Sequence, residues 1–181
     1  LVSLSDIHRY MALAKKAYLT AFSGSEFSKI GQFFGNASHP LVFCHFCDSY
    51  DEERSKKVYN QAEVLRIAPV LNAALVDYNT QYPAMNLSLF EDAMKHICRI
   101  VRVVMYHGGH ALLVGVGGSG KQSLSRLAAF ICHFTVRQIC ISSGFGEDQF
   151  LDDLRSMYYT AGVKDEGVMF LLADSQIVDE R

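Results

Sequence analysis

The sequence predicts an α/β fold, a three-layer arrangement in which helices cover both faces of a parallel sheet, preceded by a helical segment. From Ala111 onward, apolar runs of strand length alternate with amphipathic stretches in the order β-α-β-α-β, which is typical of parallel sheets. A glycine-rich loop also joins the first apolar run to a helix, the connection at which such sheets bind ligands. The expected strands are Ala111–Gly115, Val136–Ser142 and Val168–Asp174. The expected helices are one that carries Leu124, Leu127, Ala128 and Ile131, and one at Glu147–Gly162.

Two further helices are expected earlier in the chain. The first spans Ser5–Phe22, and residues 23–41, which are interrupted by glycines and Pro40, are expected to form loop and short helical pieces at a boundary between two structural units. The second runs from about Glu52 to Asp77, where Pro69 should kink or divide it. Inward-facing residues are expected at Ile7, Met11, Ala14, Tyr18 and Phe22 in the first helix and at Val58, Leu65, Leu71 and Leu75 in the second.

The stretch before the first strand carries clear signals for the start and end of a helix. Ser88 and Glu91 match a capping box, and Gly108–Gly109 supplies a stop. The buried stripe is expected at Phe90, Met94, Ile97, Val101 and Val104.

Composition limits the classes of function. The net charge of −2 and the lack of a long run of like charge argue against nucleic acid as a partner. The longest apolar runs are far shorter than the roughly 18 residues of a membrane span, so no membrane partner is expected. Five scattered cysteines suit a reducing, cytoplasmic compartment. Cys44 and Cys47 have the spacing of metal ligands, but no second such pair follows, so buried thiols are the alternative to zinc.

The stretch "GVGGSGKQS" predicts a phosphate-binding loop. Its glycines allow successive N–H groups to point at one anion, the next helix offers its positive N-terminal end, and the lysine adds a charge for the outer phosphates. The alternative is a glycine-rich turn that only connects strand and helix. The residues predicted to bind nucleotide are Gly115, Val116, Gly117, Gly118, Ser119, Gly120, Lys121, Gln122 and Ser123.

Magnesium binding and catalysis depend on three further positions, each of which departs from or leaves open the usual pattern. Asp174, at the end of an apolar run, is the candidate for holding Mg²⁺, although an aspartate there can also be a plain turn residue. Gln122 stands where a Ser or Thr hydroxyl usually binds the metal, and its amide oxygen is the candidate replacement. Ser175 stands where fast ATPases carry a glutamate, and a serine is not a base near neutral pH without a partner.

These motifs together identify a resemblance. "GVGGSGKQSL", "ADSQIVDER" and the helix-forming "MNLSLFEDAMKHICRIVRVV" resemble the fourth AAA+ module of axonemal dynein heavy chains, closely over residues 50–181. Residues 1–49 resemble the helical segment and linker that leave the preceding module. The resemblance implies an AAA+ P-loop NTPase fold and a ring motor that steps along microtubules. It also implies that Gln122 and the Asp-Ser-Gln run are family features.

Function and partners follow as expectations from this resemblance. The module is expected to bind ATP or ADP with Mg²⁺ and to regulate the motor cycle, turning nucleotide over slowly or not at all. The implied partners are neighbouring AAA+ modules and, through the parent chain, intermediate and light chains and microtubules of the ciliary or flagellar axoneme. The resemblance also places residues near Leu87 and Leu89 over an adenine ring, although both leucines are equally consistent with core packing.

The resemblance further implies that a central strand, a helical lid and an arginine finger lie outside these 181 residues, which leaves the sheet incomplete at its C-terminus and the isolated chain weakly stable. Two other functions stay open. One is an active ATPase in which Glu180, or a base from the central strand outside these residues, replaces Ser175 as the base. The other is a structural module that binds no nucleotide.

Overall fold

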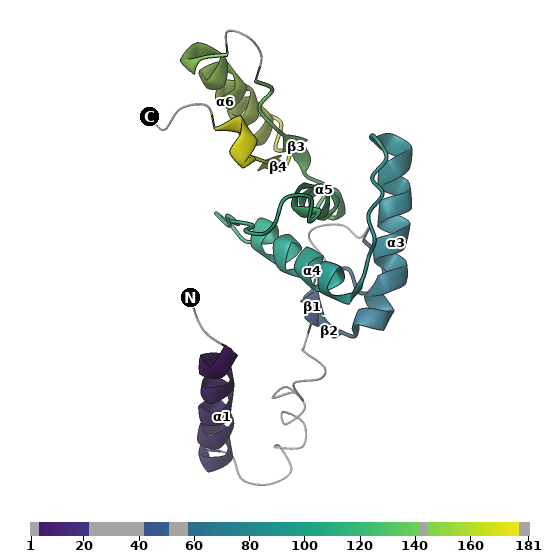
Figure 1. Cartoon of the computed structure of the whole chain (residues 1–181), viewed down its shortest axis with the longest axis vertical. Coiled ribbons are helices and arrows are strands. Elements are labelled where there is room, and N and C mark those ends of the chain that lie inside the picture. Colours follow the sequence, from purple (N-terminus) through teal and green to yellow (C-terminus); the bar gives the residue numbers. More distant parts are fainter. Residues whose placement is uncertain (1–3, 22–41, 51–57, 142–144, 178–181) are drawn as a thin grey trace. The chain divides into compact units, whose positions relative to one another are not determined.

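The computed structural model describes residues 4–21, 42–50, 58–141 and 145–177 (Figure 1). The chain forms two compact units, Leu1–Leu41 and Val42–Arg181. The division falls at the end of the stretch in which the sequence predicts a boundary. The expected loop and helical pieces at residues 23–41 lie outside the described residues.

The first unit contains helix α1, Leu4–Ala21, within one residue of the predicted bounds at each end. Of the expected apolar stripe, Ala14 and Tyr18 are half-buried, but Met11 is 38% exposed, contrary to the prediction. Lys15 and Lys16 are exposed, and the side chains of Ile7 and Phe22 lie outside the described residues.

The second unit begins with a hairpin that the sequence did not indicate. Strand β1, Val42–Cys44, pairs antiparallel with β2, Asn60–Ala62. The helix expected from Glu52 was therefore predicted too early, because pairing with an apolar strand overrides the local helical pattern. Helix α3 spans Val64–Gln81, and Val58 and Leu65 are exposed instead of buried.

Pro69 lies inside α3 without dividing it, contrary to one form of the prediction. Proline has no N–H group, so the carbonyl of Leu65, four residues before Pro69, receives no helical hydrogen bond from it. Leu65 is 84% exposed, so water can reach that carbonyl.

The core lies between α3, α4 (Glu91–Met105) and α5 (Lys121–Ile131). The buried stripe of α4 contains Met94, Ile97 and Val101 as predicted, but Phe90 is 62% exposed. The fully buried side chains at this junction are Ile67, Leu71, Ile97, Val101, Leu127 and Ile131.

The predicted capping box is wrong. Helix α4 begins at Glu91 after Phe90, and no side chain caps it. Met85, Leu87 and Leu89 are half-buried while their neighbours are exposed, the alternation of an extended segment that packs one side on the core. Because of that packing, the backbone stays extended past Ser88, so Ser88 is not the N-cap and the helix begins only at Glu91.

The C-terminal part is a β-α-β unit. Strand β3, Thr135–Arg137, pairs in parallel with β4, Val168–Phe170, and helix α6, Glu147–Gly162, connects them with the predicted bounds. A short 3₁₀ helix, η3, Asp174–Gln176, follows. In Figure 1 this unit lies on the far side of α5 from α4.

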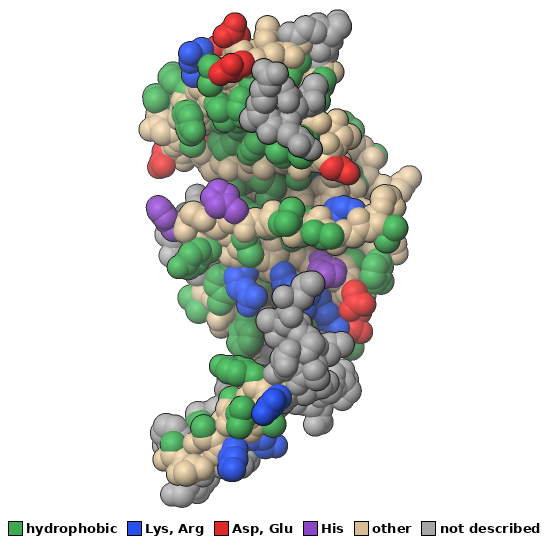
Figure 2. Space-filling view, turned by 60° about the vertical axis from the view of Figure 1, so that its left-hand side comes forward, with side chains coloured by type: hydrophobic (Ala, Val, Ile, Leu, Met, Phe, Trp, Pro, Cys, Tyr) green, Lys and Arg blue, Asp and Glu red, His purple; other side chains and the backbone are tan. Residues whose placement is uncertain are grey.

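The run Ala111–Gly115 is not the buried strand that the sequence predicts. Within the described residues no strand pairs with it, and Leu112 and Val114 are 89% and 87% exposed. Leu113 alone of this run packs against the core. Hydrophobic side chains are visible at the surface of the space-filling view (Figure 2). Without a hydrogen-bonded neighbour, an apolar run does not become a ladder strand.

Gly167 provides a test of the β3–β4 unit. A Cβ added there would lie 2.4 Å from Cδ1 of Phe134, beside the hydrogen bond that Thr135 N donates to the Gly167 carbonyl at 2.8 Å. We expect Gly167→Ala to lower the free energy of unfolding by about 1–3 kcal/mol, measured by urea denaturation. Gly162→Ala is the control, because a Cβ there meets nothing within 4 Å. Equal midpoints for the two variants would show that the close approach is not limiting.

Candidate nucleotide-binding site

The glycine-rich loop, residues 115–120, has the backbone that its sequence requires. Gly118 and Gly120 have φ angles of +75° and +74°, in the left-handed region where side chains are disfavoured. The N–H of Ser119 donates to the carbonyl of Val116 at 3.4 Å, which closes a turn. Gly120 is then the residue before α5. The glycines therefore let the chain turn sharply into the helix.

Lys121, the first residue of α5, folds back over this loop. Its Nζ donates to the carbonyls of Gly115 at 2.8 Å and Val116 at 2.7 Å and to Ser119 Oγ at 3.2 Å. The loop thus encloses a fixed positive charge, and the lysine is half-buried despite its length. These three contacts use all the donors of the ammonium group, so an anion must displace one of them to bind it directly.

The N-terminus of α5 adds to this positive potential. The first N–H groups of a helix have no acceptor within it, and Gly120 has no side chain that could cap them. The helix dipole points its positive end at the same place. Within the loop, Gly117 and Gly118 face open space, since a Cβ at either would meet nothing within 4 Å. The geometry and chemistry of the loop therefore fit a phosphate group.

The extended segment that contains Leu87 and Leu89 passes beside the loop. A Cβ at Gly120 would lie 3.6 Å from Cδ1 of Leu87, so that leucine lies directly against the start of α5. Asn79 of α3 holds the beginning of the segment: its Oδ1 accepts from Met85 N at 2.8 Å and its Nδ2 donates to the Met85 carbonyl at 3.3 Å. Both leucines pack against the core, as the core-packing alternative states, and their contact with an adenine ring stays a prediction.

The candidate metal residues lie on two elements. Gln122 is exposed and Ser123 half-buried in the first turn of α5, whereas Asp174 begins η3 and is exposed, as is Ser175. Asp179 and Glu180 lie outside the described residues. The described residues contain no group of three or more His, Cys, Asp or Glu side chains able to hold a metal ion. The donors available here, one carboxylate and one amide oxygen, suit Mg²⁺, which keeps several waters and is completed by phosphates.

Sequence reasoning missed the hydrogen bonds that connect these two elements. Arg126 of α5 donates to Gln138 Oε1, and Gln138 Nε2 donates to Gln176 Oε1 of η3 at 3.2 Å. Glutamines and arginines usually lie at solvated surfaces, so the sequence holds no signal for this chain of contacts.

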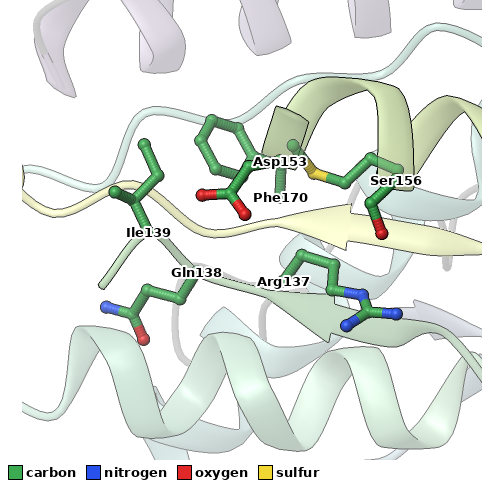
Figure 3. Close-up of a pocket in the computed structure, with 7 residues that line it drawn as sticks. Arg137, Gln138, Ile139, Asp153, Ser156 and Phe170 are labelled. Carbon is green, nitrogen blue, oxygen red and sulfur yellow. The ribbon is translucent and has the colours of Figure 1, made fainter. Parts of the chain in front are cut away.

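A small cavity of about 90 Å³ lies apart from the loop, between β3, β4 and α6. It is lined by Arg137, Gln138, Ile139, Asp153, Ser156, Met157 and Phe170 (Figure 3), and none of these is a predicted site residue.

Cys44 and Cys47 lie in the core of the second unit, as the buried-thiol alternative states. Their Sγ atoms are 3.4 Å apart, and both thiols are free. A hydrogen bond with Cys98 and burial raise the pKa of Cys44, and burial together with the Cys44 hydrogen bond raises the pKa of Cys47 to about 11. Both groups are therefore neutral thiols near pH 7 and poor nucleophiles.

Thiol labelling provides a second test. At neutral pH we expect iodoacetamide to modify the exposed Cys140 while Cys44 and Cys47 stay unmodified, because the reaction needs an accessible thiolate. Peptide mass spectrometry measures each site, and labelling in denaturant is the control in which all three react. Modification of Cys47 as fast as Cys140 would contradict its burial.

The described helices include none with the length and apolar character of a membrane span. A glycine loop with a lysine at a helix start and a parallel β-α-β unit are two features that P-loop domains share, although the run before this loop is not a strand in the described residues. Residues 85–181 match the family described as "P-loop containing dynein motor region D4".

Similar proteins agree with this match. The chain is 47% identical over its whole length to the dynein alpha chain of the flagellar outer arm of Chlamydomonas reinhardtii. It is 47% identical to dynein axonemal heavy chain 11 of Sus scrofa and 44% to the ciliary dynein beta chain of Tripneustes gratilla, in each case over 78% of the chain. The 181 residues span 3–4% of the length of these relatives. The chain belongs to the axonemal dynein heavy chain family.

Proposed function

We propose that this chain binds ATP or ADP with Mg²⁺ at the glycine loop, as the fourth, regulatory AAA+ module of an axonemal dynein heavy chain. The observation that carries the proposal is the position of Lys121, whose ammonium group is held by the carbonyls of Gly115 and Val116 at the N-terminus of α5. In this proposal residues 50–181 belong to the nucleotide-binding module, and residues 1–49 come from the preceding module.

The phosphates are held by the loop backbone and Lys121. The backbone N–H groups of residues 117, 118 and 120–123 supply the donors, and the lysine exchanges a carbonyl contact for a phosphate oxygen. A phosphate oxygen carries a full negative charge, whereas a carbonyl offers only a dipole, so the Coulombic attraction of the ammonium group favours the bound state. Leu87, against Gly120, borders the site on the side where the extended segment passes.

Asp174 and Gln122 are the residues that would hold Mg²⁺, which neutralises phosphate charge when it is bound. Helical spacing places Gln122 on the same face of α5 as Arg126, and the contacts of Arg126 lead to η3. This common face supports the proposal that Gln122 and Asp174 bind the same Mg²⁺ ion.

Slow turnover is the expected consequence of Ser175. It follows Asp174 in η3 and is exposed, and a serine hydroxyl does not accept a proton near neutral pH without an activating base. We therefore place the site among nucleotide-holding regulators and not among fast ATPases. Its location is the ciliary or flagellar axoneme, and its partners are neighbouring modules, intermediate and light chains and, through the whole heavy chain, microtubules.

Substitution of Lys121 tests nucleotide binding. We expect Lys121→Ala to weaken binding of fluorescent ATP and ADP at this site by roughly 10–100-fold, the loss of a charged hydrogen bond. Binding is measured on the whole heavy chain, and this site's share is the difference from wild type. Lys164→Ala, which removes an exposed lysine after α6, is the control. Unchanged affinity in Lys121→Ala would contradict the proposal and favour the alternative, in which the loop only connects the preceding run to α5.

Replacement of Ser175 tests the explanation of slow turnover. We expect Ser175→Glu to raise the phosphate release that depends on Lys121 by at least about tenfold, since a positioned base contributes roughly 10²–10⁴-fold. Ser175→Gln, of equal size but without a carboxylate, is the matched control and should release phosphate as slowly as wild type. Fast release by the wild-type site would instead favour another base, such as Glu180.

A further inference from the structure

We propose that Gln176 is a positioning residue which, with Gln138 and Arg126, fixes the Asp174 turn to helix α5, so that the phosphate loop and the metal aspartate keep one relative position. The inference rests on the proposed function. It assigns a role to Gln176, Gln138 and Arg126, three residues outside the glycine loop and separate from Asp174.

The side chain of Gln176 joins two backbone segments. Its Oε1 accepts a hydrogen bond from Ala173 N at 2.8 Å, and its Nε2 donates to the carbonyl of Ile139. Ala173 directly precedes Asp174, and Ile139 lies two residues beyond the end of β3. One amide group therefore ties the backbone at the metal aspartate to the chain leaving the neighbouring strand.

The sheet itself does not provide this connection. Strand pairing between β3 and β4 ends at Arg137 and Phe170, and the last backbone hydrogen bond between these two strands runs from Leu171 N to the Arg137 carbonyl at 2.8 Å. Beyond that bond, in the part of the chain described up to residue 177, the hydrogen bonds between the Asp174 turn and the neighbouring strand are those of Gln176. The position of Asp174 thus depends on a side chain.

Gln138 extends the connection to α5. Its Nε2 donates to Gln176 Oε1 at 3.2 Å, and its Oε1 accepts from the guanidinium of Arg126. In Figure 3 the Gln138 side chain points away from the side of the strands where Asp153 of α6 lies, toward the helix on the opposite side. Arg126, Gln138 and Gln176 are all half-buried, which shields their hydrogen bonds from water.

The other end of the connection is the phosphate loop. Arg126 lies four residues after Gln122 and five after Lys121 in one continuous helix. A helix of this length moves as a rigid element, so a group fixed to Arg126 is also fixed relative to the phosphate loop at the start of the helix. Loss of Gln176 should therefore leave the loop intact and release only the aspartate.

This division of roles defines the experiment. On the whole heavy chain, we expect Gln176→Leu to weaken the Lys121-dependent binding of nucleotide in Mg²⁺ by about tenfold, the usual effect of losing an outer-shell partner. Binding in chelator should not change, because the loop is unaltered. Equal weakening with and without Mg²⁺ would overturn the proposal, since it would mean that the substitution disturbs the fold.

Gln149→Leu is a matched control. The Oε1 of Gln149 accepts a hydrogen bond from Gly146 N, three residues earlier, at 3.0 Å, the same local contact that Gln176 makes with Ala173. Gln149 lies at the start of α6. We expect this variant to bind nucleotide like wild type in both conditions. A loss of Mg²⁺-dependent binding equal to that of Gln176→Leu would remove the assignment to Gln176.

Arg126→Leu tests the connection without reference to nucleotide. Amide hydrogen exchange of the peptide containing Ala173 should be faster in Arg126→Leu and Gln176→Leu than in wild type, and the double variant should resemble Gln176→Leu alone. Unchanged exchange in Arg126→Leu, or effects that add, would overturn the connection. If the wild-type chain shows no Lys121-dependent binding, the proposed function fails, while the exchange data still decide whether the connection exists.

Discussion

The burial of α5 against α4 and α3 is the interaction on which the site depends. Leu127 and Ile131 are fully buried on one side of α5, and the aromatic ring of Phe130 packs near Tyr78 and Tyr82, with ring centroids 5.6 and 6.2 Å apart. Each fully buried aliphatic side chain contributes roughly 1.5–3 kcal/mol. This packing fixes the axis of α5, and therefore the point at which its N-terminus meets the glycine loop.

One side of α5 thus packs in the core and holds the helix in place, and the other side carries candidate site residues. The buried side follows the helical period that the sequence displays, so its residues could be predicted from periodicity alone. Glycines at fixed offsets likewise predicted the loop, because positive φ angles at Gly118 and Gly120 are a local requirement of the turn. Parts of the molecule governed by local rules were therefore visible in the sequence.

Features that depend on distant partners were not predicted. The β1–β2 hairpin overrides a helical pattern. The run at Ala111–Gly115 forms no ladder in the described part of the chain, because strand formation needs a pairing partner from elsewhere in the fold and the sequence does not indicate one. Ser88 matches a capping box, yet packing of the segment around Leu87 keeps it extended. In the hairpin and at Ser88, a contact between residues far apart in sequence outweighs a local preference worth about 1 kcal/mol or less, whereas Ala111–Gly115 lacks such a contact in the described residues.

The same distinction applies to the site. A motif singles out Lys121 and Asp174 as candidates in the sequence, whereas Gln138 and Gln176 meet only in the folded chain, 38 residues apart. A site that holds nucleotide without fast turnover can act on a motor only through different affinities in different conformations. Such a site needs a physical connection from the ligand to the rest of the fold. Gln138 and Ile139 both contact Gln176 and line the cavity between β3, β4 and α6, so the Asp174 turn and that cavity have two residues in common.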